Sequence, residues 1–493
     1  MSKKKIYIIL ILSIIAGYIF LASTVNKFDS FRTIKQYFPQ EIKDFVKRKI
    51  FVYQYQEFLE TELGYAEKTQ KDFNTIQQNL SATVEKKRIK LIESYKYLNF
   101  EKTSLQKNFE IDGRKIKVQS FSTEAITIPK YEGKGTAYLD YDDNNLFVVT
   151  ANGIFSYVDV GEFKNDSFET KIIKSNIQDL VKYDRFFIGS QYGIKDVLIS
   201  QNKIFVSYLK QDDPSPNDPN RWKNNCYSTS ILVADLNYEF LEFEELFSPN
   251  MCIKEEDERY IEYLAHQSGG RISEFKDNKL LFTIGDFRTY AVAQQMENLF
   301  GKIISIDFDG QNPNIISMGH RNQQGLFYDK DNNIIFSTEH GPDGGDEVNY
   351  NENPGGEVEN FGWAISSYGD HHYKYNDKVK DKLFPLYKSH SKYGFIEPLT
   401  YFYPSIGISQ MVKIKDNNKV KDSHNLLIAS MGNHIEEGDL SLHYLKTDKD
   451  FKILNKKILP LGERIRDMIL VEEHNMVFMF LDTSASIGFF KIQ

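Results

Sequence analysis

One feature of this chain constrains its fold more than any other: a polar turn followed by a short apolar strand occurs six times. The copies are Asn144–Val149, Asn202–Ser207, Asn278–Thr283, Asn332–Ser337, His424–Ala429 and His474–Met479. Asn and Asp tolerate the positive φ of tight turns, and short apolar runs after such turns are typical of strands buried on both faces. The spacing leaves room for a small sheet and its loops in each unit, so the repeats predict a β-propeller with six blades.

Composition agrees with a strand-rich domain. The 493 residues include 37 Phe and 30 Tyr, and aromatic side chains pack well on a pleated surface. We therefore predict an all-β fold, a six-bladed β-propeller over residues 116–493. The net charge of −8 and the lack of a long basic tract argue against nucleic acid as a partner.

Residues 28–115 differ from the repeats because they are rich in Lys, Glu and Gln and almost lack Gly. Apolar residues recur mostly three or four positions apart, as in an amphipathic helix; they are Leu59, Leu63, Ala66, Phe73, Ile76, Leu80, Val84, Leu91, Tyr95 and Leu98. We predict a helical stalk or spacer of one or two helices, either standing free or packed on the main domain. A dimer through this segment is an alternative, although the heptad pattern is not sustained.

Residues 1–27 predict a short cytoplasmic tip and a transmembrane anchor. Lys3, Lys4 and Lys5 precede the uncharged run from Ile6 to Val25, which is long enough to cross a hydrocarbon core of about 30 Å. Lysines before the run place the rest of the chain outside the cytoplasm, on the periplasmic or extracellular side. A cleaved signal peptide is the alternative, but the run is long for one and no clear cleavage site follows.

The two cysteines, Cys226 and Cys252, bear on the same compartment. An exported domain with two cysteines permits one disulfide bond. Two unpaired, partly buried thiols are the alternative.

A first polar cluster lies beside glycines at a predicted strand end. It spans Ala265–Arg271 and contains His266, and the strand after it ends at Asp286. His266 can take up a proton near neutral pH, and Asp286 on the next strand is placed to orient its ring. A surface histidine beside a glycine turn is the alternative.

Two further clusters and an arginine pair follow. Gly319–Leu326 contains Arg321, which can polarise a carbonyl group or bind an anion. Thr338–Glu347 sets acidic residues among glycines, which suits a hard cation such as Ca²⁺ that accepts backbone oxygens. Arg464 and Arg466 share one face of a strand, which suits an anionic ligand. The alternatives are a polar loop, a solvated acidic turn and a solvated sheet edge.

Taken in order, these segments resemble the glucose/sorbosone dehydrogenase family. The resemblance rests on His-Gln-Ser-Gly, Thr-Ile-Gly-Asp, Gly-His-Arg-Asn-x-Gln-Gly-Leu and Glu-His-Gly-Pro-x-Gly-Gly-Asp-Glu, followed by Asn360–Trp363. It extends from about Gly133 to Gln493. Members of the family are six-bladed propellers that oxidise aldoses with pyrroloquinoline quinone (PQQ) and Ca²⁺, so the resemblance implies both cofactors here.

The resemblance also implies roles for single residues. His266 matches the base that takes the proton from the anomeric hydroxyl group, and Asp286 matches the carboxylate that orients this base. Hydride then passes from the sugar carbon to the quinone, giving a lactone. Arg321 matches the arginine beside the quinone carbonyls, where negative charge develops.

The remaining implied roles are those of cofactor and metal ligands. The residues that match cofactor contacts are Arg321, Asn322, His340, Ser405, Arg464 and Arg466. The last three of these match residues that hold the cofactor carboxylates. Gly341 and Pro342 match the residues whose backbone carbonyls bind the Ca²⁺ ion that also touches the quinone.

Three positions depart from the family pattern. The strand and turn at Leu426–Asn433 lack the lysine that pairs with a cofactor carboxylate in well-characterised members. Ala265 stands where glucose-oxidising members carry an acidic residue, and Gln323 replaces a proline. These departures bear on cofactor affinity and on substrate preference.

The sequence therefore predicts a membrane-anchored, PQQ- and Ca²⁺-dependent dehydrogenase that oxidises a small aldose sugar. Its electrons would leave for an acceptor in or near the membrane. One alternative is a non-catalytic propeller that serves as a binding or scaffold module. Another is a Ca²⁺-dependent lactonase, a reaction that usually needs several carboxylates on the metal ion.

Overall fold

The structure, a computed structural model, describes residues 81–126, 135–181, 183–188, 191–212, 225–254, 265–371, 382–415 and 423–492. These residues belong to a compact unit that begins at Gln78. The predicted anchor at 1–27 and most of the predicted helical segment lie outside the described residues. Within the described ranges, no helix is both long enough and apolar enough to span a bilayer.

All six repeated segments form strands, as predicted. They are β4 (Asn145–Thr150), β8 (Lys203–Asp212), β14 (Lys279–Ile284), β18 (Ile334–Glu339), β23 (His424–Ser430) and β27 (Met476–Leu481). Almost every residue in them is buried, so both faces of each strand are covered. Asn202, Asn278, Asn333 and Asn475 in the preceding turns have positive φ angles of 50° to 60°, which asparagine adopts more readily than most residues.

Each repeated strand is the second strand of a small antiparallel sheet. The first strands are β3 (Ala137–Asp142), β7 (Ile194–Ser200), β13 (Gly269–Phe275), β17 (Gln323–Asp329), β22 (Ile408–Lys413) and β26 (Ile465–Val471). The third strands are β5 (Phe155–Asp159), β9 (Cys226–Asp235), β15 (Lys302–Asp307), β19 (Asp346–Asn351), β24 (Ser441–Thr447) and β28 (Ser486–Lys491). Outer strands are β6 (Ser167–Ser175), β11 (Glu244–Phe247), β16 (Asn314–Met318), β21 (Thr400–Phe402) and β25 (Ile453–Pro460), with short additions β10 (Phe240–Leu241), β12 (Ile253–Lys254) and β20 (Glu359–Asn360).

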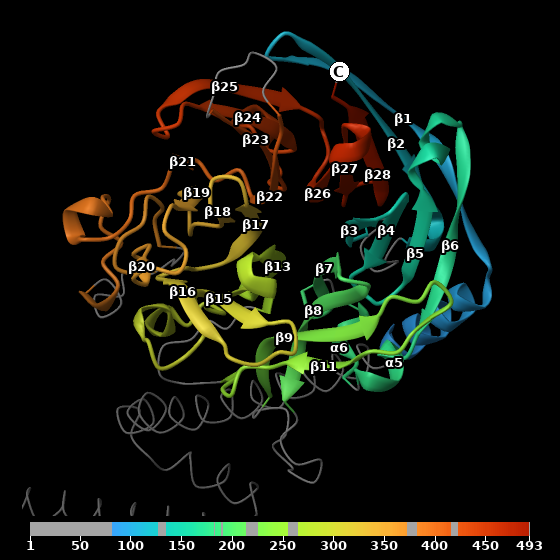
Figure 1. The fold of residues 1–493 in the computed structure, drawn as a ribbon, viewed down its shortest axis with the longest axis horizontal. Helices are drawn as coiled ribbons and strands as arrows, with labels where there is room; N and C mark the ends of the chain where they lie inside the picture. Colours follow the sequence, from blue (N-terminus) through green and yellow to red (C-terminus); the bar gives the residue numbers. More distant parts are fainter. Residues whose placement is uncertain are drawn as a thin grey trace, which may run out of the picture. The chain divides into compact units, whose positions relative to one another are not determined.

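The first strands form a closed ring. Each contacts the next in the order β3, β7, β13, β17, β22, β26 and back to β3. The sheets extend outward from this ring (Figure 1). The unit therefore has the all-β, propeller-like fold that the repeats predict.

The ring is closed by strands from both ends of the described chain. β1 (Tyr97–Ile111) and β2 (Arg114–Ser122) form a hairpin. β2 pairs with β28 and supplies the fourth strand of the C-terminal sheet, while β1 also pairs with β6. This double pairing of β1 joins the first and last sheets into one ten-stranded sheet.

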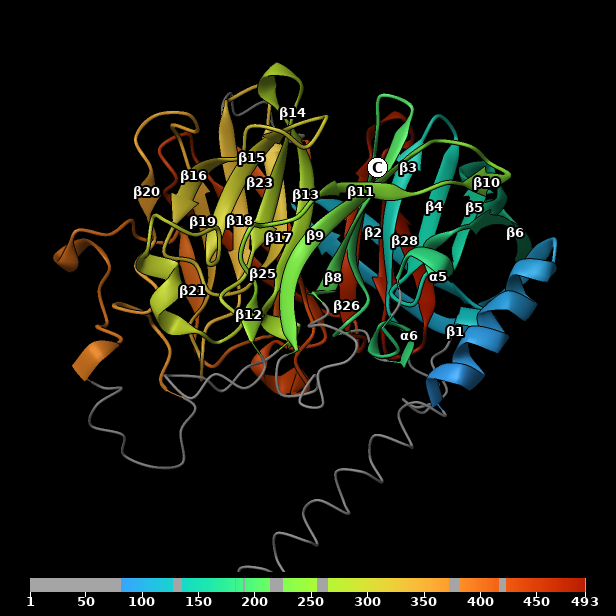
Figure 2. The ribbon, with the colours of Figure 1, turned by 90° about the horizontal axis from the view of Figure 1, so that it is seen from below.

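The β1–β2 hairpin corrects the predicted helical segment, which ran to residue 115. A helix does cover residues 81–94, and it lies beside β1 (Figure 2). From Tyr97 onward the chain is a strand, because Leu98 and Phe100, and later Ile116 and Val118, are buried at every second position. That period of two belongs to a strand, whereas the helix buries residues three or four apart.

Short helices occupy the connections between strands. They are η3 (Glu124–Ile126), η5 (Val160–Lys164), α5 (Ile177–Leu180), α6 (Arg185–Ile188), η6 (Ala265–Gln267), η7 (Lys276–Asn278), η8 (Tyr290–Gln294), η9 (Ser391–Tyr393), η10 (Ile435–Glu437) and η11 (Glu472–His474). Of these, η6 carries His266 and precedes the ring strand β13.

A buried ionic network crosses the centre of the ring. Arg271 on β13 donates from Nη1 to Asp196 on β7 at 3.0 Å and to Asp467 on β26 at 2.6 Å. The other carboxylate oxygens accept from the backbone nitrogens of Ile272 and Leu139, at 2.8 and 2.7 Å. All three charged side chains are buried. We call Arg271, Asp196 and Asp467 the Arg271 network; it links four ring strands and leaves no carboxylate oxygen without a donor.

Cys226 and Cys252 form a disulfide bond in the structure, which settles the choice that the sequence left open. It ties the start of β9 to the segment before β12, the short strand that pairs with β9. Because it closes a loop with a sequence separation of 26 residues, a bond of this kind contributes roughly 3 kcal/mol.

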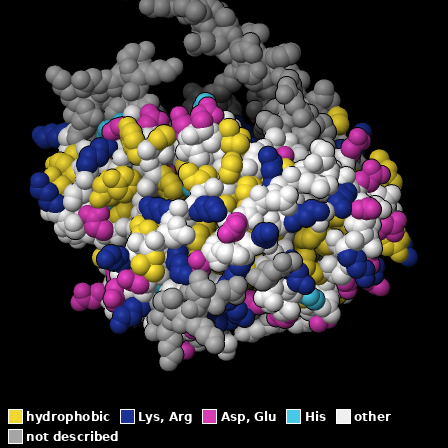
Figure 3. All heavy atoms as spheres, turned by 90° about the horizontal axis from the view of Figure 1, so that it is seen from above, with side chains coloured by type: hydrophobic (Ala, Val, Ile, Leu, Met, Phe, Trp, Pro, Cys, Tyr) yellow, Lys and Arg dark blue, Asp and Glu magenta, His cyan; other side chains and the backbone are white. Residues whose placement is uncertain are grey.

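Charged side chains of both signs are intermixed over the face shown in Figure 3. No field of one sign dominates that face.

Candidate functional site

The predicted site residues meet at one end of the ring. Because neighbouring strands are antiparallel, the start of each first strand and the end of each second strand lie at the same edge. His266 precedes β13, Arg321 precedes β17 and Arg464 precedes β26, while Asp286 and His340 follow β14 and β18. All five therefore lie at the edge where the ring strands begin.

Backbone hydrogen bonds join the three clusters. Phe287 N donates to Gln267 O at 2.9 Å, and Asp286 N donates to Arg321 O at 2.9 Å. His340 N in turn donates to Asn322 O at 3.1 Å. The segments that the sequence singled out separately are thus one connected structure.

His266 lies at the exposed rim of this structure, in η6. Loss of surrounding water lowers the pKa of its imidazole to about 4, and the charges of Lys195, Arg288, His340 and Arg321 act in the same direction. His266 is therefore neutral at neutral pH, the form that accepts a proton.

Asp286 is fully buried. Its carboxylate accepts from the indole Nε1 of Trp363 at 2.7 Å and from the backbone nitrogen of Arg288 at 2.8 Å. Burial raises its pKa to about 6, and the nearby charge of Arg321 offsets part of this rise. Among the described residues no hydrogen bond joins Asp286 to His266, so its orienting role stays a prediction.

Arg321 is buried and positioned on three sides. Its backbone nitrogen donates to Glu339, its Nη1 donates to His340 O at 2.9 Å, and its guanidinium lies over the Trp363 ring at 5.3 Å. Burial lowers its pKa, and Asp286 opposes this shift. Trp363 therefore contacts both Asp286 and Arg321, a role that the sequence did not assign to it.

Asn322 and His340 lie next to Arg321. The Asn322 side-chain oxygen accepts from Gly269 N at 3.2 Å. The His340 ring lies 3.8 Å from Asp346. Burial lowers the pKa of His340, Asp346 raises it, and Arg321 and the two later arginines lower it further. The charges of all three arginines therefore act on this ring.

Asp346 organises the loop that carries the predicted metal ligands. This fully buried carboxylate accepts from Gly341 N at 3.0 Å and from the Ser405 hydroxyl group at 2.9 Å. It also accepts from the backbone nitrogens of Ile406 and Ile408. The sequence suggested that acidic residues here bind a cation, whereas Asp346 holds Gly341 and Ser405 in place.

The arginine pair reaches the site from β26. Arg464 Nη1 donates to Met431 O and to the Asn433 side chain. Arg466 pairs with Asp482 at 2.7 Å. Their guanidinium groups are thus bound to different partners, yet both influence His340.

The structure adds two cations that the sequence did not predict. Lys195 in β7 and Arg288 after β14 are, after burial, the largest influences on the pKa of His266. We call Lys195, Arg288, Arg321, Arg464 and Arg466 the site cations. A cluster of positively charged side chains of this kind favours an anionic ligand. The sequence signal for Lys195 is a lysine directly after Ile194 in a segment that is otherwise largely apolar, which the structure shows to be strand β7.

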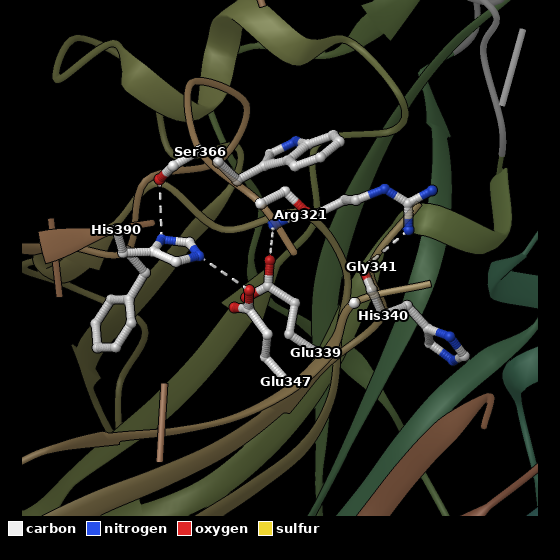
Figure 4. A pocket seen from close by; sticks show the side chains of 11 residues that line it. Arg321, Glu339, His340, Gly341, Glu347, Ser366 and His390 are labelled. Carbon is white, nitrogen blue, oxygen red and sulfur yellow. Dashed lines mark hydrogen bonds and ion pairs between the residues drawn. The ribbon is translucent and has the colours of Figure 1, made fainter. Parts of the chain in front are cut away.

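A cavity of about 10 Å³ lies behind Arg321, with room for about one water molecule. Figure 4 shows the carboxylates of Glu339 and Glu347 close together at this cavity, while the His340 ring points away from them. His390 joins Glu347 at 3.1 Å and Ser366 at 2.9 Å.

The described side chains bear on which ligands a metal ion could have at this loop. In the part of the chain that the structure describes, no group of three or more His, Cys, Asp or Glu side chains could hold a metal ion. The metal ligands that the sequence implies, Gly341 and Pro342, would act through backbone oxygens, and this role stays a prediction. Gly341 lines the small cavity, whereas Pro342 does not.

Comparison with known proteins places these residues in a family context. Residues 142–487 match the family model described as glucose / sorbosone dehydrogenase. The chain is 27% identical over 223 residues to an uncharacterized protein of Synechocystis sp., covering 41% of this chain and 50% of that protein. It is 25% identical over 216 residues to the aldose sugar dehydrogenase YliI of Escherichia coli, covering 41% and 53%. The chain thus spans about half the length of the curated relatives it matches.

Solved structures agree on the fold. The soluble aldose sugar dehydrogenase of Escherichia coli in its apo form aligns with a TM-score of 0.55 at 17% identity, covering 76% of this chain and 99% of that one. The PQQ-bound aldose sugar dehydrogenase of Streptomyces coelicolor aligns with a TM-score of 0.50 at 14% identity, covering 77% and 98%. At these identities the likeness establishes the fold alone.

Proposed function

The chain belongs to the glucose/sorbosone dehydrogenase family, and from this premise we propose that it is a quinoprotein dehydrogenase that oxidises an aldose to its lactone with PQQ and Ca²⁺. One observation carries the proposal: backbone hydrogen bonds join the segments of His266, Asp286 and Arg321 at one edge of the ring, where positive charges act on the neutral His266 imidazole. A base without a proton and a surplus of positive charge are what a sugar alcohol and an anionic quinone require.

His266 accepts the proton in this mechanism. Its pKa of about 4 keeps it unprotonated near neutral pH, and its exposed position lets a sugar hydroxyl group reach it. The O–H bond of the anomeric hydroxyl breaks toward His266 while the C–H bond gives up a hydride. When bound, PQQ supplies the two-electron oxidant that takes this hydride.

The other site residues would position the quinone and the metal ion and would neutralise negative charge. Arg321, held by His340 O and stacked on Trp363, would place positive charge where the quinone oxygens gain electrons. Arg464, Arg466 and Ser405 would hold the quinone carboxylates, with Asn322 and His340 as further contacts. Ca²⁺ would lie on the backbone oxygens of Gly341 and Pro342.

The finer architecture is part of the proposal. The ten-stranded sheet divides at β1 into the β3–β6 set and the β26–β28 set completed by β2, which supports six blades. We further propose that residues 1–27 anchor the chain in a membrane, with the propeller outside the cytoplasm and near an electron acceptor.

Dye reduction with a panel of aldoses tests this function. The full chain, supplied with PQQ and Ca²⁺, is expected to reduce an electron-accepting dye at the expense of an aldose. His266→Ala should lower kcat by about 10²- to 10⁴-fold, the usual contribution of a general base.

The matched control is Lys203→Met, since Lys203 is a surface residue paired with Asp235. It should leave the rate unchanged. An unaltered rate in His266→Ala, or no dye reduction by the wild-type chain with any aldose, would refute the proposed function.

A further inference from the structure

Two buried carboxylates behind Arg321 have no part in the proposed mechanism. Glu339 ends β18 and Glu347 is the second residue of β19, and the two residues are paired directly across these strands. Both side chains are buried, and both line the small cavity behind Arg321. Figure 4 shows their carboxylates close together. Such a pair needs an explanation, because glutamate is rarely this buried unless its oxygens are hydrogen-bonded.

Glu339 holds the backbone of Arg321. Its Oε1 accepts from Arg321 N, and its Oε2 is hydrogen-bonded to His320 Nδ1 at 2.8 Å. The His320 ring is fixed in turn, since its Nε2 lies 2.8 Å from Ser317 Oγ and the ring stacks on Phe361 with 4.7 Å between the centroids. Every side chain in this arm is buried. The Glu339 arm therefore fixes the point from which the Arg321 side chain extends.

Glu347 holds the turn that carries Trp363. Its Oε1 is hydrogen-bonded to His390 Nε2 at 3.1 Å, and His390 Nδ1 is hydrogen-bonded to Ser366 Oγ at 2.9 Å. Both partners lie against the Gly362 backbone, because a Cβ atom added there would lie 2.2 Å from Ser366 Oγ and 2.7 Å from His390 Nδ1. Gly362 directly precedes Trp363. The Glu347 arm therefore supports the turn from which the Trp363 ring extends.

The two arms meet at Arg321. Its guanidinium lies over the Trp363 ring, and its Nη1 donates to the carbonyl of His340, the residue after Glu339. Displacement of a catalytic group by about 1 Å can lower a rate about 100-fold, so a functional arginine needs a rigid support. The backbone of Arg321 and its aromatic stacking partner are each held by one buried glutamate.

We propose that Glu339 and Glu347 are positioning residues for Arg321. Glu339 fixes its backbone, and Glu347 fixes the turn of Trp363, on which its guanidinium stacks. This inference rests on the proposed function for the part that Arg321 plays at the quinone. The hydrogen bonds of the two carboxylates carry the role, so an uncharged acceptor of the same shape should serve in their place.

Modification of arginine by phenylglyoxal, followed by mass spectrometry, tests the proposal on the full chain without any ligand. Arg321 is 3% exposed, so its modification in the wild-type chain should be slow. Glu339→Ala and Glu347→Ala should each raise that rate at least fivefold, because the guanidinium loses one of its supports. Glu339→Gln and Glu347→Gln keep an oxygen acceptor and should stay within twofold of wild type.

Two controls separate positioning from a general loss of structure. Arg464, which is held by other residues, should react at the same rate in every variant. Glu274→Ala removes a partly exposed glutamate from the ring strand β13 and should leave the Arg321 rate unchanged. An Arg321 rate within twofold of wild type in either folded alanine variant would overturn the proposal, as would glutamine variants that react like the alanine variants.

Optical titration with PQQ connects the position of Arg321 to the proposed function. With Ca²⁺ present and without sugar, both alanine variants should bind PQQ with at least a tenfold higher Kd, and both glutamine variants should stay within threefold of wild type. An unchanged Kd in an alanine variant with faster Arg321 modification would contradict the part assigned to Arg321. A wild-type chain that binds no PQQ would refute the proposed function, while the modification rates would still decide the positioning roles.

Glu339→Asp and Glu347→Asp cover the case in which an alanine variant does not fold. Each keeps the charge, but the side chain is one methylene group shorter and would no longer span its partners. The Arg321 modification rate should rise at least threefold in each. A rate equal to that of the wild-type chain would overturn the proposal for the glutamate concerned.

Discussion

Two regions of the molecule contain buried or half-buried arginines but differ in how many carboxylates accompany them. In the Arg271 network, one guanidinium is shared by Asp196 and Asp467, and backbone donors complete both carboxylates. Among the site cations, Arg464 is bonded to neutral oxygens and Arg466 shares a single carboxylate, Asp482. The difference separates two arrangements: a cation balanced by two buried carboxylates links the ring strands, whereas the site cations supply the positive charge that we propose binds an anionic ligand.

The largest expected effect comes from breaking the balanced region. Arg271→Met would leave two carboxylates buried without their cation, which costs about 3–5 kcal/mol. Urea unfolding should report this loss of stability. Lys203→Met should stay within about 0.5 kcal/mol of wild type, and a similarly small change in Arg271→Met would contradict the distinction between the two regions.

The disulfide bond provides a second way to lower the stability of the folded unit without changing either group of arginines. Replacing both Cys226 and Cys252 with Ala should lower stability by roughly 3 kcal/mol, because the unfolded chain gains freedom. PQQ affinity should not change, since neither cysteine reaches the site cations. Chemical unfolding and an optical PQQ titration on the same sample would measure both; a large loss of affinity with intact stability would be the contrary result.

The buried carboxyl group of Asp286 tests the comparison through the pH dependence of stability. Its folded-state pKa of about 6 lies above the ordinary value of 3.8 because the carboxyl is buried. The folded state therefore holds the proton more tightly than the unfolded chain, so this contribution to stability is present below pH 3.8 and is lost as the pH rises through 6. The loss amounts to at most about 3 kcal/mol for a shift of this size.

Asp286→Asn should remove that pH dependence. The difference in unfolding free energy between wild type and variant should move in the variant's favour between pH 4 and pH 7. A difference that stays constant over this range would show that Asp286 is ionised throughout, with its charge fully compensated by Arg321.

The smallest effect on stability is expected from a substitution in the site itself. Arg464→Met removes a half-buried cation bonded to neutral oxygens, so its stability should change by less than about 1 kcal/mol. Its PQQ affinity should fall about 10- to 100-fold, the value of one hydrogen bond to a charged group. Differential scanning calorimetry with a parallel PQQ titration would test the pair of results; an unfolded variant, or unchanged affinity, would contradict it.

Much of the fold could be predicted because its signal is local. Each repeated strand carries its own turn and apolar run, and all six positions were correct. The β1–β2 hairpin was missed because its partners, β28 and β6, are far away or later in the chain. β1 is also about half exposed, so its Lys- and Glu-rich sequence looked helical.

The candidate site divides in the same way, into features with a local sequence signal and features that depend on residues distant in the chain. Motifs mark His266, Asp286 and Arg321, and backbone hydrogen bonds join the segments that carry them, while their roles stay predictions. The position of Lys195 against Gly270 could not be predicted, since it is the packing of β13 beside β7 that brings the two residues together. The acidic cluster at Thr338–Glu347 was interpreted as suited to a cation because a sequence cannot say which backbone donors will surround a carboxylate such as Asp346.

Thermal unfolding with PQQ and Ca²⁺ tests the central claim most directly, because a ligand that binds only the folded state must stabilise it. The account predicts that PQQ raises the melting temperature of the wild-type chain in a dose-dependent manner, equivalent to about 2.7 kcal/mol at a hundredfold excess over Kd. It predicts a weaker rise in Arg464→Met. An unchanged melting temperature of the wild-type chain at saturating PQQ would contradict the claim that the site cations bind an anionic quinone.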